Sequence, residues 1–247
     1  MSDRLRNLLL IFLFIIVTIF TAFHEGYLSL ISLPFWLAVI GGFLISAWLA
    51  WTISTKRLLS LILGIFIIEY IKETIGVRSG MWKYHGVNEL YIFGVWAWVL
   101  GGLTAYTLSI KIVIRQIQRL QLSLPRWVNP IILTVISLLI PLTLGDYWSG
   151  AGMLFWLLYT ALFIAGIYSS LRMDFPVFAG IIITAWIVGN PSEYIGSVAS
   201  NVWTFTYNPG YPPFFLLVGC WPLEILAQYS LSALLADEPL NQIGGKS

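Results

Sequence analysis

The chain alternates between apolar segments of about twenty residues and short segments that carry most of its charges. Segments of this length match helices that cross a bilayer, and they lack the alternation of transmembrane strands. The pattern predicts eight helices, at about residues 8–23, 31–53, 58–75, 90–110, 130–144, 153–171, 175–190 and 213–235. We therefore expect an all-α integral membrane protein, an eight-transmembrane-helix bundle that forms a single domain over residues 1–247.

The composition agrees with this pattern and excludes several classes of protein. Hydrophobic residues make up 59% of the chain and charged residues 10%, against about 25% charged residues in soluble domains. The single cysteine, Cys220, excludes a disulfide framework and a thiolate metal site. Two histidines, His24 and His85, are too few for a membrane di-iron oxygenase. We expect no metal, no cofactor and no nucleic-acid partner, and the oligomeric state stays open.

Positive residues gather on one side of the predicted membrane. With eight helices, that side receives Arg4, Arg6, Lys56, Arg57, Lys111, Arg115, Arg119, Arg126, Arg172 and Lys246. The other side receives Lys72, Arg78 and Lys83. Because cytoplasmic loops carry the excess of Lys and Arg, we expect a multi-pass protein of the cell inner (cytoplasmic) membrane with both termini cytoplasmic. The charged segment 111–126 predicts an amphipathic helix on the membrane surface.

The two halves of the chain resemble each other weakly. Glu73–Gly76 matches Glu193–Gly196, Trp82–Tyr84 matches Trp203–Phe205, and Gly94–Trp96 matches Gly219–Trp221. With four helices in each half, the pattern predicts two parallel repeats, residues 1–112 and 128–236, and a site at their interface on the outer side. The alternative is chance, since Gly, Trp and Ile are abundant here.

Five acidic residues fall in the outer half of the predicted membrane. A charge inside a bilayer costs about 2.5–3.5 kcal/mol on insertion scales and is often functional. The candidates for catalysis are Glu69, Glu73, Glu193 and Glu224, and Asp146 is a candidate for substrate binding. Glu69 and Glu73 share a helix face with Lys72, whereas Glu224 has no charged neighbour in the sequence. A desolvated carboxylic acid there keeps its proton and acts as a general acid; the alternative is structural ion pairs, Glu69–Lys72 and Glu73–Arg78.

Aromatic residues surround these acids in the predicted topology. The candidates for substrate binding, together with Lys72, are Trp82, Tyr84, Trp96, Trp98, Trp203 and Trp221. Their rings could line a cavity for an apolar ligand and stabilise a carbocation. An aromatic belt at the membrane interface, or simple packing, is the alternative for each of them.

The segment E-x-x-G-x-x-S-G-x-W-x-Y, from Glu73 to Tyr84, resembles a motif of membrane carotenoid-biosynthesis proteins, the small lycopene cyclases and the carotenoid hydratases. Trp203–Phe205, followed by Trp221–Glu224, resembles the second loop and the acidic helix of the cyclases, although Ile225 replaces their second acid. The resemblance implies a helical bundle that protonates a polyene without a metal or a redox step. It would make Glu73 and Glu224 the acids.

These observations lead to one interpretation and two alternatives. The first is a membrane protein whose outer acidic and aromatic pocket binds a membrane lipid or another hydrophobic small molecule of isoprenoid type. It would act on this molecule by acid catalysis without a cofactor. The second is a proton-coupled transporter of small solutes or lipids, and the third is a non-catalytic membrane assembly factor.

Overall fold

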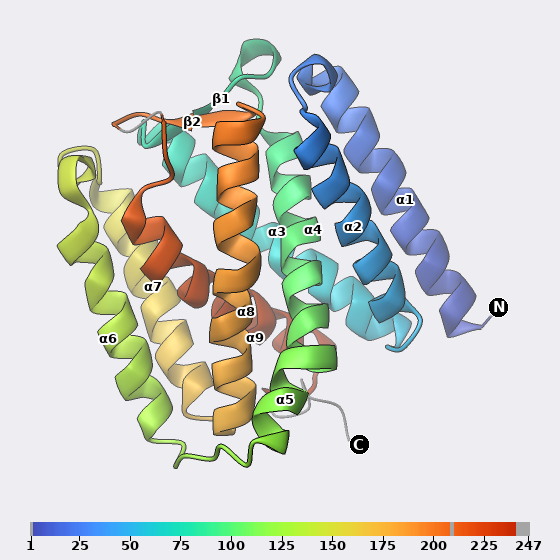
Figure 1. Cartoon of the computed structure of the whole chain (residues 1–247), viewed down its shortest axis with the longest axis vertical. Coiled ribbons are helices and arrows are strands. Elements are labelled where there is room, and N and C mark those ends of the chain that lie inside the picture. Colours follow the sequence, from blue (N-terminus) through green and yellow to red (C-terminus); the bar gives the residue numbers. More distant parts are fainter. Residues whose placement is uncertain (1, 208–209, 241–247) are drawn as a thin grey trace.

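The computed structural model describes residues 2–207 and 210–240, and over these ranges the chain folds into eight long helices (Figure 1). They are α1 (Asp3–His24), α2 (Leu33–Ala50), α3 (Thr55–Arg78), α4 (Ile92–Leu108), α6 (Val128–Thr143), α7 (Met153–Ser170), α8 (Phe175–Tyr194) and α9 (Trp221–Ala236). A π-helical turn, Ser109–Val113, joins α4 to α5 (Ile114–Arg119). Two short strands, β1 (Trp82–Tyr84) and β2 (Trp203–Phe205), pair with each other. The predicted all-α class is confirmed.

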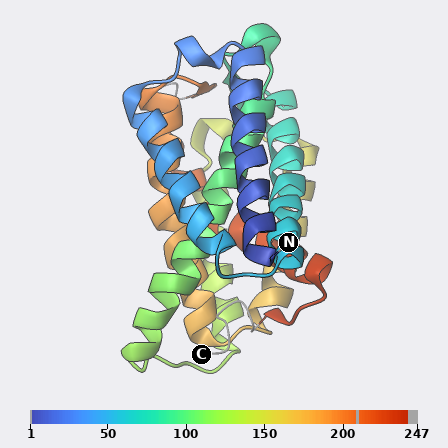
Figure 2. The same ribbon diagram turned by 90° about the vertical axis from the view of Figure 1, so that its right-hand side faces the viewer.

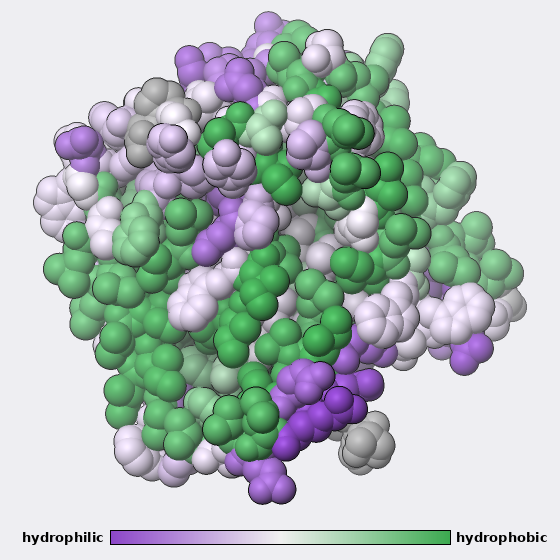
Figure 3. All heavy atoms as spheres, in the orientation of Figure 1, coloured by the Kyte–Doolittle hydropathy of each residue, from purple (hydrophilic) through white to green (hydrophobic). Residues whose placement is uncertain are grey.

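The hydropathy of the helices identifies a multi-pass membrane protein. In the described part of the chain, five helices are long and apolar enough to cross a bilayer: Asp3–His24, Leu33–Ala50, Ile92–Arg119, Met153–Ser170 and Phe175–Ala199. The apolar helix α6 is shorter, and α3 and α9 carry the buried charges described below. Figure 3 shows hydrophobic residues over most of one face, with hydrophilic residues mainly toward its two ends.

Four helices, α3, α4, α8 and α9, form the centre of the bundle. α1 and α2 flank this centre on one side, and α6 and α7 flank it on the other (Figures 1 and 2). The helices α3 and α9 pack closely, since a Cβ atom on Gly64 would lie 2.5 Å from Ser232 Oγ and 3.0 Å from the Ser232 backbone nitrogen. Leu58, Leu61 and Ile65 of α3 are fully buried, so α3 is a core helix despite its charges.

The beginning of α1 and the end of α9 lie at the same end of the bundle. Thr55, at the start of α3, donates to Asp3 at 3.2 Å, and Arg57 forms a 3.2 Å ion pair with Glu238, just beyond α9. The strands β1 and β2 lie at the opposite end (Figure 1). The described part of the chain therefore ends on the side of the bundle where it begins.

Two buried asparagines join the outer helices of each side. Asn7 of α1 donates to the carbonyl oxygens of Ala50 and Ile53, at 2.9 and 2.8 Å, beside the end of α2. Asn129 of α6 donates in the same way to Ser170 and Met173, at 3.1 and 2.9 Å, beside the end of α7. Each amide satisfies carbonyl groups that a helix end leaves without partners.

Two predictions of helix boundaries were wrong. The helix expected to end near Pro191 continues to Tyr194 and then through a π-helical turn, Ile195–Ala199. A proline removes a single N–H from the helix, here the donor to the Ile187 carbonyl, and the helix continues past it with that one bond missing.

The charged segment after residue 110 does not begin a separate surface helix, because α4 runs through the π turn into α5. There Ile114 packs so closely on Gly180 of α8 that a Cβ atom on this glycine would lie 2.4 Å from Ile114 Cγ1. Packing against α8 therefore keeps the first part of this segment in line with α4.

Candidate functional site

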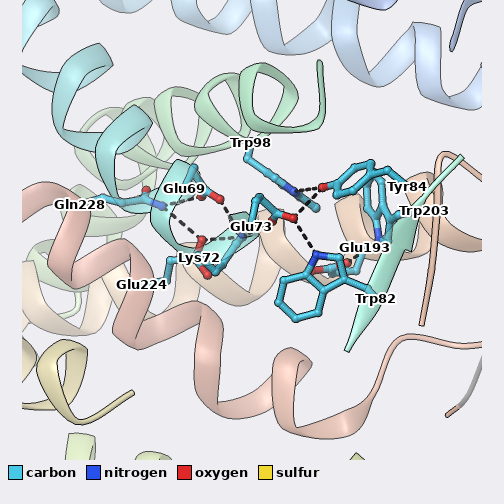
Figure 4. Close-up of polar contacts among 10 residues, drawn as sticks. All are labelled: Glu69, Lys72, Glu73, Trp82, Tyr84, Trp98, Glu193, Trp203, Glu224 and Gln228. Carbon is cyan, nitrogen blue, oxygen red and sulfur yellow. Dashed lines mark hydrogen bonds and ion pairs between the residues drawn. The ribbon is translucent and has the colours of Figure 1, made fainter. Parts of the chain in front are cut away.

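Lys72 is the centre of a buried polar cluster. Its Nζ atom lies 2.7 Å from Glu69 Oε2, 3.1 Å from Glu73 Oε1 and 2.8 Å from Glu224 Oε1 (Figure 4). Helical spacing puts Glu69, Lys72 and Glu73 on one face of α3, and that face meets α9, which carries Glu224. We call Glu69, Lys72, Glu73, Glu224 and Gln228 the Lys72 cluster.

Gln228 is the member of the Lys72 cluster that the sequence analysis missed. Its Nε2 atom donates to Glu69 Oε1 at 2.7 Å and lies 3.4 Å from Glu224 Oε1. It follows Glu224 by four residues on α9, so both side chains extend from the same face. The available signal was an amide one helical turn from an acid in a mainly apolar helix, since a polar group inside a membrane needs a partner.

The Lys72 cluster is almost completely removed from solvent. The exposed fractions are 0% for Glu69, 2% for Glu73, 3% for Glu224 and 9% for Lys72. Three carboxyl groups therefore share one ammonium group in a site of low dielectric. Buried charges are costly unless each is paired and hydrogen-bonded, so the arrangement holds more acid groups than its single cation can balance.

Strand β1 places two aromatic side chains on Glu73. Trp82 Nε1 donates to Glu73 Oε2 at 2.7 Å, and the Tyr84 hydroxyl donates to the same oxygen at 2.9 Å. Burial and the Glu73 carboxyl group hold the pKa of Tyr84 well above its usual value, so its hydroxyl keeps the proton that it donates. Gly76 makes room for Trp82, because a Cβ atom there would lie 1.9 Å from the indole ring.

Strand β2 repeats this arrangement in the second half of the chain. Trp203 Nε1 donates to Glu193 of α8 at 3.2 Å, and a Cβ atom on Gly196 would lie 1.7 Å from the Trp203 ring. Glu193 is 5% exposed, and it lines a small cavity together with Lys72. The strands pair antiparallel, with Lys83 opposite Thr204.

Two further indole rings lie against the ammonium group. Lys72 Nζ is 4.9 Å from the ring centre of Trp98 and 5.4 Å from that of Trp221. The Trp98 ring also contacts Trp221 at 5.1 Å and Trp203 at 4.9 Å between ring centres. Aromatic faces therefore stabilise a positive charge at this position.

Three hollows lie in a row through the Lys72 cluster. The middle one, of about 10 Å³, is lined by Lys72, Glu73, Glu193 and Glu224 and by the surrounding aromatic rings. The α3–α7–α9 groove, of about 40 Å³, shares Lys72, Trp82 and Glu224 with it and is otherwise lined mainly by apolar residues. The α2–α4–α8 groove, of about 320 Å³, shares Trp98 and Trp203 with the middle hollow and is almost entirely apolar.

Two of the predicted site residues lie outside the site. Trp96 faces away from the Lys72 cluster and packs on Phe14 and Phe66, at 5.4 and 4.8 Å between ring centres. Asp146 is exposed in the connection between α6 and α7. The structure brings the other predicted residues together: Glu69, Lys72, Glu73, Trp82, Tyr84, Trp98, Glu193, Trp203, Trp221 and Glu224.

The alternative ion pair of Glu73 with Arg78 does not form. Arg78 is exposed at the end of α3, and Glu73 contacts Lys72 instead.

Among residues 2–207 and 210–240, no group of three or more His, Cys, Asp or Glu residues has a geometry suited to a metal ion. No protein-family model, curated protein or solved structure matches the chain.

Proposed function

We propose that the protein binds a hydrophobic lipid of isoprenoid type and acts on it by acid catalysis at the Lys72 cluster, without a cofactor. The observation that carries this proposal is the contact of Lys72 with three carboxyl groups from two helices, inside a bundle and beneath a wall of indole rings. The membrane lipid or hydrophobic small molecule would reach this site from the side of the bundle.

The balance of charge supports a proton donor. Glu193 adds a fourth carboxyl group to the surroundings of Lys72. If all four were ionised, one ammonium group would face four negative charges where water is nearly absent, at a cost of several kcal/mol for each unpaired ion. Protonation of the surplus carboxyl groups removes this cost. The site then stores acid protons away from water, as a general acid for an apolar substrate requires.

The positions of the acids and the rings support the reaction step. Glu224 or Glu73 would give its proton to a carbon of a substrate double bond, so that an O–H bond breaks and a C–H bond forms. The resulting carbocation would lie near Trp98 and Trp221, whose faces already stabilise the Lys72 charge. It would then return a proton from a neighbouring carbon to the carboxylate, or take up water and release a proton. This is also the chemistry implied by the resemblance to lycopene cyclases and carotenoid hydratases.

We also propose that the bundle arose from two parallel repeats, residues 1–112 and 128–236. Matched contacts support this: Asn7 and Asn129 join the first two helices of each half. The Glu73–Trp82 and Glu193–Trp203 hydrogen bonds are a second such pair. The antiparallel pairing of β1 with β2 is what an approximate two-fold axis would produce, and the Lys72 cluster would then lie at the interface of the halves.

An eight-pass topology with both termini in the cytoplasm accompanies this proposal. α3, α6 and α9 would complete the five apolar helices as membrane spans, and an even number of spans agrees with the common end of α1 and α9. Arg4, Lys56 and Arg119 lie at or beside helix ends on that side, as the positive-inside rule favours for a cytoplasmic face. The Lys72 cluster would then occupy the outer half of the inner membrane.

The close packing of α3 and α9 disfavours the alternative function, a proton-coupled transporter. A transporter needs a polar path from the Lys72 cluster to the cytoplasmic end. Below the cluster, Gly64 lies directly against Ser232, and Leu61 and Ile65 are fully buried. A non-catalytic assembly factor would need only the Lys72–Glu224 ion pair to join α3 to α9, which leaves the surplus carboxyl groups around Lys72 without a structural reason.

The test is proton transfer to carbon in heavy water. Purified protein in lipid vesicles is incubated with an acyclic isoprenoid polyene, and the lipids are analysed by mass spectrometry. Acid catalysis predicts a product that keeps one deuterium on carbon, with turnover at least about a hundredfold lower in Glu224→Gln and Glu73→Gln. Asp146→Asn, which removes an exposed carboxylate outside the cluster, is the matched control and should leave turnover unchanged. Equal turnover in all variants, or no deuterium on carbon, would contradict the proposal.

A further inference from the structure

The two grooves beside the Lys72 cluster are lined from corresponding positions in the two halves of the chain. On the second helix of each half, the lining positions differ by a constant 120 residues: Ala38 with Leu158, Val39 with Tyr159, and Gly42 with Leu162. The third helices follow the same rule, with Lys72 opposite Ser192, and the strands follow it with one extra residue in the second half, with Trp82 opposite Trp203. The grooves therefore occupy the same place in each half.

The fourth helices correspond with a shift of 123 residues. Leu100 and Gly101 line one groove where Leu223 and Glu224 line the other. The same shift pairs Trp98 with Trp221 and Tyr106 with Tyr229, and each pair is in ring contact, at 5.1 and 4.9 Å between centres. Residues related by a two-fold axis meet in this way. This register replaces the match of Gly94–Trp96 with Gly219–Trp221, which would pair Trp221 with Trp96.

At these corresponding positions, the smaller side chain is always in the α2–α4–α8 groove. The α2–α4–α8 groove has Ala38, Val39 and Gly42 where the α3–α7–α9 groove has the larger Leu158, Tyr159 and Leu162. The volumes follow, at about 320 against 40 Å³. The larger groove therefore holds less side-chain volume than its counterpart at these positions.

The same positions differ in charge. Glu224 and Lys72 of the α3–α7–α9 groove correspond to Gly101 and Ser192 in the α2–α4–α8 groove. At the positions next to them, Glu69 and Gln228 correspond to Gly189 and Ala105. The larger groove thus has none of the groups that hold Lys72, while Trp98 and Trp203 form its wall toward the Lys72 cluster.

We propose that the α2–α4–α8 groove binds the linear hydrocarbon chain of the substrate, and that its small residues Gly42 and Gly101 create the space. This inference rests on the proposed function and assigns the binding of the chain to one half of the bundle and the chemistry to the other. Phe35 and Ile45 mark the extent of the groove on α2, a length of about 15 Å at helical rise. A linear chain fits this shape, and its end at Trp98 and Trp203 adjoins the carboxyl groups.

One polar atom in the groove has no partner among the described residues. The Thr104 hydroxyl is buried without a hydrogen bond, and it lines the groove six residues after Trp98 on α4, somewhat less than two helical turns. An unpaired buried hydroxyl costs about 1–3 kcal/mol, and a single oxygen on the bound chain would satisfy it. The groove therefore favours a hydrocarbon with at most one polar group away from the reacting end.

The experiment is photolabelling of the full chain in lipid nanodiscs with a linear isoprenoid hydrocarbon that carries a diazirine. We expect saturable labelling of the residues of α2, α4 and α8 that line the groove, displaced by excess unlabelled hydrocarbon. Gly101→Leu fills open space, since the nearest atom to an added Cβ is Trp98 Cε3 at 3.9 Å, and should weaken binding about tenfold. Gly41→Leu, where nothing lies within 4 Å of an added Cβ, is a second filling variant.

The matched control is Ala161→Leu, which introduces the same side chain on the exposed face of α7 and should leave labelling unchanged. Leu162→Gly should open the α3–α7–α9 groove and create a second labelled region. Labelling that does not saturate, that lies mainly on α3, α7 and α9 in the wild-type chain, or that is unchanged from the wild type in both filling variants would overturn the proposal. Glu224→Gln separates the two proposals: saturable labelling in the α2–α4–α8 groove with unchanged turnover would contradict the proposed catalysis and leave the binding site standing.

Discussion

Lys72 Nζ and Glu224 Oε1 lie 2.8 Å apart, although 152 positions separate these residues in the sequence. This contact joins α3 to α9 at the place where the two halves of the chain meet. Glu224 shares the ammonium group with Glu69 and Glu73 of α3, so the same ion pair that assembles the candidate site also fixes the packing of the two central helices.

Loss of the ammonium group should destabilise the bundle. Lys72→Met leaves buried carboxyl groups without their counter-ion, and we expect the free energy of unfolding to fall by about 3 kcal/mol or more. Denaturant unfolding in detergent micelles measures this change, and Lys56→Met, at an exposed position, should have little effect. Combining Lys72→Met with Glu224→Gln should cost less than the sum of the two single changes; strict additivity would mean that the two groups do not interact.

The glycines beneath Trp82 and Trp203 should both be intolerant of a methyl group. Cβ atoms on Gly76 and Gly196 would lie 1.9 and 1.7 Å from the indole rings, so alanine forces the ring or the helix to move. We expect Gly76→Ala and Gly196→Ala each to cost about 1–3 kcal/mol of unfolding free energy. Gly41→Ala, with open space around it, should be neutral or stabilise α2 by up to about 1 kcal/mol. A neutral effect at either packed glycine would refute the close contact.

The indole N–H groups should contribute to stability through the carboxyl groups that accept them. Trp82→Phe keeps most of the ring but removes the donor to Glu73, at an expected cost of about 1–3 kcal/mol. Trp203→Phe removes the longer bond to Glu193, 3.2 against 2.7 Å, and should cost less. Thermal unfolding of each variant, compared with Trp127→Phe at an exposed ring, measures the difference. A larger loss at Trp203 than at Trp82 would contradict this ranking.

Cysteine labelling tests the eight-pass topology. In a Cys220→Ala background, Ser149→Cys should react with a membrane-impermeant maleimide on intact spheroplasts, because it lies in the exposed connection between α6 and α7. Arg119→Cys, at the opposite end of the bundle, should react only after permeabilisation. Labelling of both positions from outside would show that one predicted span does not cross the membrane.

Much of the Lys72 cluster could be predicted from the sequence because its members carry charge in apolar surroundings. The i, i+3, i+4 spacing put Glu69, Lys72 and Glu73 on one face, and Glu224 was conspicuous as an isolated acid. Gln228 was missed because an uncharged amide differs less from its apolar neighbours than a charged group does. The partner of Lys72 on α9 could not be predicted either, since distance along the chain does not indicate which helices pack together.

The position of a residue along a predicted helix indicated its depth in the membrane, but not which face of the helix meets the Lys72 cluster. Trp96 and Trp98 lie at nearly the same depth, yet two residues turn the helix by about 200°, so only Trp98 faces Lys72. The strands β1 and β2 were not predicted because three residues are too few for a recognisable alternation. They form because Trp82 and Trp203 are each held by a carboxyl group and a glycine, so that the two backbone segments that carry these rings lie side by side and pair antiparallel.

The pairing of β1 with β2 links the charge of two buried carboxyl groups to a backbone segment at the surface of the protein. Two strands of three residues are too short to be stable by themselves. Their inward-facing indole groups donate hydrogen bonds to Glu73 and Glu193, while Lys83, in the middle of β1, is exposed. A proton on either carboxyl group weakens the hydrogen bond from its indole N–H, and loss of that proton strengthens it. The backbone amide hydrogens of β1 and β2 should then exchange faster or slower with solvent. Their exchange rate therefore reports the charge of Glu73 and Glu193, although these carboxyl groups are themselves buried.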